Sequence, residues 1–334
     1  MCGITGIFDT RGKREIDRAV LHRMNESQFH RGPDEGGLHI EPGVGLGHRR
    51  LSIIDLSTGQ QPLYNEDQTV CVVFNGEIYN YQELIPELQA AGHRFHTKSD
   101  TEVIVHAWEE WGPECLKRFN GMFAFAVWDE PRGRLLLARD RAGEKPLFYW
   151  SDGRELVFAS DLRAFLAHPR VPKAVDPVAL RRYLTHDYFP APLSPLAGVR
   201  KLPAGHLLIA EDCRVSVRRY WDLAEHFARP ELARRGTADL ADELDQRIAQ
   251  AVRRRSRSDV PFGLFLSGGI DSSTVLAHIA EQQGEGVPVF SIGHQDKGFD
   301  EASMAEVTAR HFKADFNQLI LGESDLADGL RRGG

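Results

Sequence analysis

The chain begins with MCGITGIF at residues 1–8, in which Cys2 directly follows the initiator methionine. Removal of Met1 would leave a thiol and a free α-amino group on the same residue. The thiolate is the reactive form of cysteine, and an α-amine with a pKa near ~7.7–8.0 can accept a proton at neutral pH. The alternative is an ordinary buried cysteine near a chain terminus, and the rest of the sequence has to distinguish between the two.

The composition is that of a soluble globular protein. The 334 residues are 42% hydrophobic and 27% charged, which suits about two domains with a sizeable core. The net charge of −7 argues against a general nucleic-acid-binding protein. No run reaches the ~18 apolar residues of a membrane span, and the first 13 residues lack the apolar core of a signal peptide.

The four cysteines lie far apart in the sequence, at positions 2, 71, 115 and 213. They form no CxxC pair, so the sequence predicts neither a zinc-binding framework nor a disulfide pattern. Cysteine usage of this kind is typical of a reduced, cytoplasmic protein, and that is the location we expect.

Short apolar runs and helical patterns alternate over the first two-thirds of the chain, which predicts an α+β domain with many strands. One helix is expected between Asn80 as its cap, with Glu83 in capping-box spacing, and Gly92 as its stop. Four strand patterns between residues 122 and 159 are typical of an antiparallel meander. Strands are expected at 4–8, 71–74, 122–128, 134–138, 146–150, 156–159 and within 206–221, and further helices at 15–30, 101–111, 161–168 and 176–186.

The pattern changes near residues 225–236, where we place a domain boundary between residues 2–225 and 236–334. Beyond it, helices and strands alternate, which predicts parallel strands joined by right-handed crossovers. Helices are expected at 237–255, 272–283 and 301–312, and strands at 261–266, 287–292 and 315–320.

Asn75 and Gly76 end a buried strand and are followed by Glu77. At such a strand end a side-chain amide and a backbone N–H can both point at one developing oxyanion, and each donor of that kind is typically worth ~10²–10³ in rate. An Asn-Gly turn without a catalytic role is the alternative.

Three further segments carry charges that suit the recognition of an amino-acid substrate. Arg50, which precedes a strand-like run, could bind a carboxylate through its guanidinium fork or form a surface salt bridge. Asp100 could bind an ammonium group, cap the helix that follows it, or do both. The loop HRGPD at residues 30–34 carries charges that could close over the same site.

Seven segments recur in this order in glutamine-hydrolysing asparagine synthetases: MCGITGIF, HRGPDE, GHRRLSIIDL, FNGEIYN, SDTEVI, GMFAFAVWD and RDRAGEKPLFY. The chain resembles that family over nearly its whole length, and among its members the asparagine synthetase-like amidotransferases of bacterial polysaccharide and exosortase gene clusters. The resemblance implies a class II glutaminase domain with the N-terminal-nucleophile fold, a four-layer α/β/β/α sandwich, followed by an α/β parallel-sheet ATP-pyrophosphatase domain.

The resemblance also implies a role for each residue of these motifs. Cys2 would be the nucleophile and its amine the base, while Asn75 and the N–H of Gly76 would form the oxyanion hole. Glutamine would be held by Arg50 at its α-carboxylate, by Glu77 and Asp100 at its α-amino group, and by backbone groups of Leu51 and Ile53. The sequence departs from the family at Ala142 and Glu144, where relatives usually carry larger apolar residues, and we expect this departure to lie away from the nucleophile.

A second motif, FLSGGIDSS at residues 265–273, follows an expected strand and opens a helix. Glycines let the backbone approach a phosphate, and serine hydroxyls and helix N-terminal N–H groups donate to its oxygens. A plain strand-to-helix turn is the alternative, and the GK[ST] ending of a Walker A loop is missing. The motif resembles the pyrophosphate loop of ATP pyrophosphatases, which implies Mg²⁺ at Asp271 and an ATP site formed by Leu266, Ser267, Gly268, Gly269, Asp271, Ser272, Ser273, Ile292 and Gly293.

The resemblance implies transfer of ammonia from glutamine to an acceptor carboxylate, aspartate or an unknown substrate, that ATP activates as its AMP ester. A homodimer is a further possibility. The family continues well beyond the point that corresponds to residue 334, so we expect an incomplete ATP domain and activity in the glutaminase half-reaction only. Two alternatives stay open: another class II amidotransferase, against which SGGIDSS argues, and a protein that binds glutamine or nucleotide without turnover.

Overall fold

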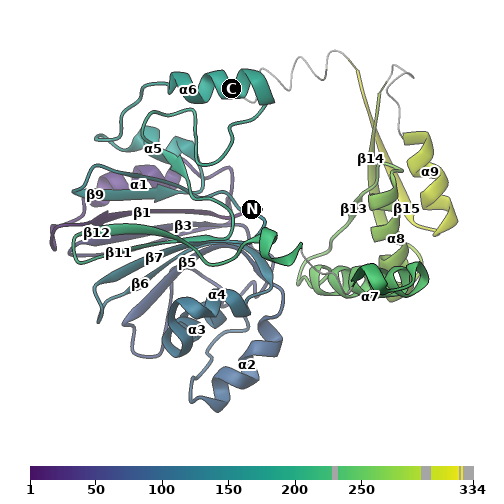
Figure 1. Ribbon diagram of the computed structural model, residues 1–334, viewed down its shortest axis with the longest axis horizontal. Coiled ribbons are helices and arrows are strands. Elements are labelled where there is room, and N and C mark those ends of the chain that lie inside the picture. The colour runs from purple at the N-terminus through teal and green to yellow at the C-terminus, as the bar shows by residue number, and fades with distance from the viewer. Residues whose placement is uncertain (228–231, 295–301, 323–324, 326–334) are drawn as a thin grey trace. The chain divides into compact units, whose positions relative to one another are not determined.

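The computed structural model describes residues 1–227, 232–294, 302–322 and 325. The chain divides into two compact units, Met1–Ala228 and Arg229–Gly334, which are coloured purple to green and green to yellow in Figure 1. In the described part of the chain, no helix is both long and apolar enough to cross a membrane.

Two six-stranded sheets form the centre of the first unit. Sheet A has the order β10-β8-β9-β1-β3-β2 and sheet B the order β12-β11-β7-β6-β5-β4, with antiparallel pairing throughout. The strands of sheet A are β1 (Gly3–Asp9), β2 (Glu35–Glu41), β3 (Val44–Arg50), β8 (Phe148–Ser151), β9 (Glu155–Ala159) and β10 (Arg200–Lys201). Those of sheet B are β4 (Leu63–Tyr64), β5 (Val70–Ile78), β6 (Gly121–Asp129), β7 (Arg134–Arg139), β11 (His206–Glu211) and β12 (Arg214–Arg219).

Helices cover the outer face of each sheet, so the unit has four layers, as the resemblance implied (Figure 1). Those over sheet A are α1 (Arg18–Glu26) and α5 (Leu162–Ala167), with α6 (Pro177–His186) beyond them, and those over sheet B are α2 (Tyr81–Ala90), α3 (Glu102–Trp111) and α4 (Cys115–Arg118). Short 3₁₀ helices span Gly112–Glu114, Leu223–His226 and Leu232–Arg234.

Alternation along the strands explains the layers, because successive side chains point to opposite faces of a sheet. On β1, Ile4 and Phe8 face sheet B, whereas Ile7 faces α1 and α5. On β5, Cys71 and Val73 face sheet A, whereas Val72 between them faces α3. Both sheets are therefore apolar on both faces, as layers enclosed in a sandwich must be.

The four strands between residues 122 and 159 were expected to form one antiparallel meander, and this expectation is wrong because they belong to two sheets. The hairpin β6–β7 belongs to sheet B, while β8–β9 belongs to sheet A. Each hairpin has the predicted strands, but the local pattern carries no information on which sheet a hairpin joins. Four strands were also missed: β2 and β3 are rich in glycine, histidine and charge, and β4 and β10 are only two residues long. Arg50 ends β3 rather than preceding a strand, since residues 51–53 have no regular structure.

Two expected helix caps have a different geometry. Asn80 is the N-cap residue of α2, but its side chain makes no cap hydrogen bond. Instead its amide donates to Arg118 O at 3.0 Å and accepts from Asn120 N at 2.8 Å. Asp100 is not the cap of α3, whose N-cap residue is Thr101. Tertiary contacts thus replace local capping at both positions.

The second unit contains a parallel sheet of three strands with helices between them, as predicted from its alternating pattern. Its order is β13-β14-β15, with parallel pairing at both steps. The elements are α7 (Thr237–Arg255), β13 (Leu264–Phe265), α8 (Ile270–Gln283), β14 (Pro288–His294), α9 (Ala302–His311) and β15 (Asp315–Leu321). A small core forms between the sheet and these helices.

We predict that Phe158→Ala strongly destabilises the first unit. The Phe158 side chain is fully buried between the sheets, and truncation of such a ring typically costs ~3–5 kcal/mol. All five tryptophans lie between residues 108 and 221, so urea unfolding followed by tryptophan emission reports on this unit alone. Val178→Ala is the matched control, since Val178 is 59% exposed on α6, and it should change the free energy of unfolding by less than ~0.5 kcal/mol. Equal effects of the two variants would contradict the assignment of Phe158 to the core.

Candidate active site

A cavity of about 250 Å³ opens in the first unit, next to the start of the chain. All eight residues that were predicted to form the glutamine site line this one cavity: Cys2, Arg50, Leu51, Ile53, Asn75, Gly76, Glu77 and Asp100. Four of them lie on β3 and β5, and the others lie just before β1, just after β3 and in the segment between α2 and α3. The fold thus brings together residues that lie up to 98 positions apart in the sequence.

Strand register explains how Cys2 and Asn75 reach the same cavity. Gly3 pairs with Arg49, which brings Cys2 beside the end of β3. Cys2 is separated from Ile4 and Phe8 by an even number of positions, so its side chain points to the same face of the sheet as theirs, toward sheet B. Asn75 likewise points to the same face of β5 as Cys71 and Val73, toward sheet A. The two side chains therefore point into the space between the sheets from opposite walls.

The Cys2 thiol is largely buried and lies against the backbone of Leu51. Leu51 N–H donates to Sγ at 3.4 Å, and Sγ lies 3.6 Å from Leu51 O. Burial raises the pKa of the Cys2 thiol, although the Leu51 N–H and the positive charge of Arg50 oppose the shift. A neighbouring base is therefore needed to form the thiolate at neutral pH.

Asn75 supplies a hydrogen-bond donor that has no partner among the residues that the structure describes. Its side chain is 1% exposed, and its Nδ2 atom is buried without a hydrogen bond. Leaving such a donor unpaired costs free energy, so its place on the cavity wall favours an acceptor from a ligand. At the next position only glycine fits, because a Cβ atom on Gly76 would lie 2.1 Å from Met122 O.

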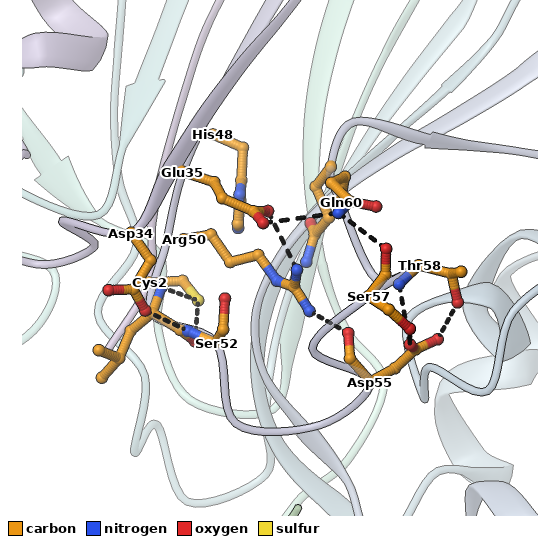
Figure 2. Close-up of polar contacts among 12 residues, drawn as sticks. Cys2, Asp34, Glu35, His48, Arg50, Ser52, Asp55, Ser57, Thr58 and Gln60 are labelled. Atoms are coloured by element: carbon orange, nitrogen blue, oxygen red, sulfur yellow. Dashed lines mark hydrogen bonds and ion pairs between the residues drawn. The ribbon is translucent and has the colours of Figure 1, made fainter. Parts of the chain in front are cut away.

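Arg50 is held firmly at the cavity wall, so it is not the exposed salt bridge that was weighed as the alternative. Its side chain is 4% exposed, with Nη1 3.0 Å from Glu35 Oε2. Nη2 donates to Ile54 O at 3.0 Å and to Asp55 O at 2.6 Å. Figure 2 shows the guanidinium between Glu35 and the turn at Asp55. These contacts use three of the five N–H groups of the guanidinium, so among the described residues two remain that could donate to a carboxylate ligand.

Asp100 brings a buried carboxyl group to the same cavity. Its side chain is almost fully buried, and Oδ2 accepts from Ile78 N at 2.8 Å. Burial, with a contribution from the charge of Glu77, raises the pKa of Asp100 to about 7. An ammonium group placed between these two carboxylates would favour their ionised forms.

The loop at residues 30–34 packs against the segment that carries the thiol. Arg31 Nε donates to Cys2 O at 3.0 Å, and Asp34 Oδ2 accepts from Ser52 N at 2.8 Å. Figure 2 shows Asp34 and Ser52 beside Cys2. The loop thus supports the nucleophile segment from outside.

Lys145 is a cavity residue that the sequence analysis missed. It lines the same cavity as Cys2, and burial lowers the pKa of its amine. Its neighbours Ala142 and Glu144, which we expected to lie away from the nucleophile, are not among the residues that line this cavity. The motif RDRAGEKPLFY contained the signal, since a lysine among turn residues faces either solvent or a site.

The SGGIDSS loop of the second unit joins β13 to α8, as predicted. Gly268 has φ +78°, and a Cβ atom there would lie 2.6 Å from Ala305 N, so the loop requires glycine. The side chains of Ser267 and Ser272 face each other, with 3.2 Å between their Oγ atoms. The first turn of α8 has no side-chain cap, so its N–H groups suit a phosphate.

The remaining residues of the predicted ATP site have different surroundings. The Leu266 side chain is 2% exposed and packs in the core of the unit, so only its backbone is available to a nucleotide. Ile292 is half exposed, whereas Gly293 is buried. Asp271 lies in the first turn of α8 beside the serines, where its carboxylate would suit Mg²⁺ only together with phosphate oxygens.

Two family models match the chain in succession. A model described as glutamine amidotransferase domain matches residues 1–221, and one described as asparagine synthase matches residues 243–332. Asparagine synthetase [glutamine-hydrolyzing] 3 of Bacillus subtilis is 34% identical over 99% of this chain and 56% of its own length. Putative asparagine synthetase [glutamine-hydrolyzing] 2 of Methanocaldococcus jannaschii is 35% identical over 98% of this chain and 66% of its own length.

The chain thus spans about half to two-thirds of the length of these curated relatives. A solved structure described as the allosteric regulatory enzyme of purine biosynthesis aligns with a TM-score of 0.50 at 18% identity, over 96% of this chain and 80% of the other. At that identity the likeness concerns the fold alone.

The raised pKa of Asp100 generates a prediction about stability. The carboxyl has a pKa of about 7 in the folded protein but ~3.9 when unfolded. The folded state therefore binds the proton more tightly, and the free energy of unfolding falls as pH rises between these two values. Relative to wild type, Asp100→Asn should gain stability on going from about pH 4.5 to about pH 8. Urea unfolding of both proteins, followed by tryptophan emission, measures the difference; a gap that does not change with pH would contradict a raised pKa.

Proposed function

Because the chain belongs to the family of glutamine-hydrolysing asparagine synthetases, we propose that its first unit hydrolyses glutamine at Cys2. One observation carries the proposal: the buried, unpartnered Asn75 Nδ2 lines the same cavity as the Cys2 thiol. A nucleophile and an unused donor on facing walls are the two groups that attack on an amide requires.

The proposed reaction proceeds through a γ-glutamyl thioester. After removal of Met1, the α-amine of Cys2 takes the thiol proton, and Sγ attacks the side-chain amide carbon of glutamine. Asn75 Nδ2 and the N–H of Gly76 stabilise the negative charge that develops on the amide oxygen. The amine returns the proton to the leaving nitrogen as ammonia departs, and it then activates the water that hydrolyses the thioester to glutamate.

The charged residues of the cavity suit the α-carbon end of glutamine. We assign the α-carboxylate to Arg50, whose position is fixed by Ile54 O and Asp55 O. Glu77 and Asp100 take the α-ammonium group, and backbone groups of Leu51 and Ile53 complete the pocket. Removing water from these charges strengthens each contact, since the effective dielectric constant inside a protein is low.

The second unit suits activation of the acceptor. We propose that the loop at residues 265–273 binds ATP phosphates together with Mg²⁺ at Asp271, in a site that also includes Ile292 and Gly293. An acceptor carboxylate, aspartate or a related compound, would be activated as its AMP ester and then take the ammonia. The asparagine synthase match at residues 243–332 favours this over other class II amidotransferases. Four free thiols support a reducing, cytoplasmic location.

Cys2→Ala should abolish glutamate release from glutamine, measured with no ATP or acceptor present. The reason is that no other cysteine lines the cavity, among the residues that the structure describes. Cys213→Ala is the matched control, because Cys213 is a free, exposed cysteine, and it should keep full activity. Turnover by Cys2→Ala would place the nucleophile elsewhere. Intact mass of the active protein should lack Met1.

Asn75→Ala should lower kcat for glutamine hydrolysis by ~10²–10³ with little change in KM, because its amide is needed mainly in the transition state. The folded protein should not lose stability, since Nδ2 makes no hydrogen bond in the free protein. Steady-state kinetics and the urea midpoint measure the two effects. A change confined to KM would refute the oxyanion role.

A further inference from the structure

Four side chains of the types that bind metals gather beside α3, and none of them lines the cavity that contains Cys2. They are Glu66, His93, His106 and Glu109, and one ligand atom from each lies within 4.8 Å of the others. Glu66 comes from the turn between β4 and β5, His93 follows α2, and the other two lie on α3. The cluster thus joins three segments that cover the outer side of sheet B.

His106 is the central member of the cluster, and in the described part of the chain its ring has no hydrogen-bond partner. Its side chain is 0% exposed, and both ring nitrogens are buried without a hydrogen bond. Nδ1 lies 3.6 Å from Glu66 Oε2 and 3.5 Å from Glu109 Oε2, and the latter oxygen is also unpartnered. These separations are too long for hydrogen bonds. They do match the ~3.4 Å between ligand atoms of a tetrahedral ion bound at ~2.1 Å.

The second oxygens of the two carboxylates are fixed by other groups, so the orientation of each carboxylate is set. Glu66 Oε1 accepts from Arg94 N at 2.7 Å, and Glu109 Oε1 accepts from Asn65 Nδ2 at 2.6 Å. Both Oε2 atoms are thereby directed at His106 Nδ1. Metal-binding carboxylates are commonly held in this way by outer hydrogen bonds.

The two histidines share one arrangement. Each turns Nδ1 toward the cluster, and each has a carboxylate beside Nε2: Glu102 Oε1 lies 3.6 Å from Nε2 of His106, and Glu110 Oε2 lies 3.6 Å from Nε2 of His93. A carboxylate that accepts a hydrogen bond from the distal nitrogen is the usual companion of a zinc-bound histidine. Glu102 and Glu110 lie on that side of the rings, and each 3.6 Å separation would have to shorten for the bond to form. Nδ1 of His93 lies 3.8 Å from Glu109 Oε2.

We propose that Glu66, His93, His106 and Glu109 bind one Zn²⁺ ion. Two imidazoles with two carboxylates suit Zn²⁺, which is intermediate between hard and soft metal ions, whereas Mg²⁺ and Ca²⁺ require oxygen ligands. Four protein ligands complete a tetrahedron, which is typical of a structural site. The ion would tie the turn at Glu66 to α3 and to the start of the segment at residues 92–101, which ends in the cavity residues Ser99, Asp100 and Thr101.

A proton on His106 is the competing way to satisfy this cluster. Burial by itself lowers the pKa of His106, but the carboxylates of Glu102 and Glu109 outweigh it and raise the pKa to about 9. A protonated His106 would donate both N–H groups to carboxylates and leave no nitrogen lone pair for a metal. Metal analysis distinguishes the two occupants directly.

The test is Zn²⁺ binding by the full chain after treatment with a chelator, followed by calorimetry and by metal analysis after dialysis. The Cys2→Ala background removes the thiol of the other cavity as a binding group. We expect one Zn²⁺ per chain, no binding of Mg²⁺, and a higher Tm with zinc than without. The visible spectrum of the Co²⁺-loaded protein should be that of a tetrahedral site.

Two variants of ligands and one control complete the experiment. His93→Ala and Glu109→Gln should each weaken Zn²⁺ binding by more than ~100-fold, because removal of a direct ligand costs more than loss of an outer partner. His93 and Glu109 are both partly exposed, so these variants should fold, which tryptophan emission checks. His22→Ala, at an exposed position of α1, should bind as the parent does. Absence of Zn²⁺ from the parent protein, or equal binding by all variants, would overturn the proposal.

Discussion

The pairing of β1 with β3 and β9 is the constraint on which the first unit depends. All seven residues of β1 are buried, because the strand has neighbours on both sides in sheet A and layers on both of its faces. Gly6 is required at its centre, since a Cβ atom there would lie 2.3 Å from the Phe158 ring. The strand therefore has a single register against β3 and β9. That register determines where the backbone of Cys2 lies, so only the rotamer of its side chain remains to be set.

The site forms where the space between the two sheets ends. Deeper in the sandwich, alternation fills this space with apolar side chains such as Ile4, Phe8 and Val73. Near the start of β1 the same alternation brings in Cys2 and Asn75 instead. A link between the layers lies beside them, because His48 on β3 approaches Phe74 O on β5 at 2.9 Å. The cavity is thus a continuation of the core in which polar residues replace apolar ones.

Burial gives both sites of the first unit their chemical character. It raises the pKa of the Cys2 thiol and of the Asp100 carboxyl, so each group needs a partner of suitable charge before it ionises. It also makes the unpartnered atoms of Asn75 and His106 costly unless a ligand meets them. The segment at residues 92–101 runs from His93 of the cluster to Asp100 of the cavity, so a metal ion bound at one end would restrain the other.

The sequence by itself determined the parts of this protein that depend on neighbours along the chain. The parallel strands of the second unit, the SGGIDSS turn and most helices follow from periodicity and turn residues within short windows. The resemblance of seven ordered motifs also identified eight of the residues that line the cavity, from Cys2 to Asp100. Family membership rather than spacing supplied that list, because no local pattern relates residue 2 to residue 100.

Only the tertiary structure decided what depends on contacts between distant segments. The hairpins β6–β7 and β8–β9 look alike in sequence but join different sheets, since their apolar faces fit either layer. Packing buries the Asp100 carboxyl, for which the sequence also allowed a role as a helix cap, and the fold places Lys145 beside the cavity. The cluster of Glu66, His93, His106 and Glu109 has no motif, because three segments supply it and only the packing of α3 on sheet B brings them together.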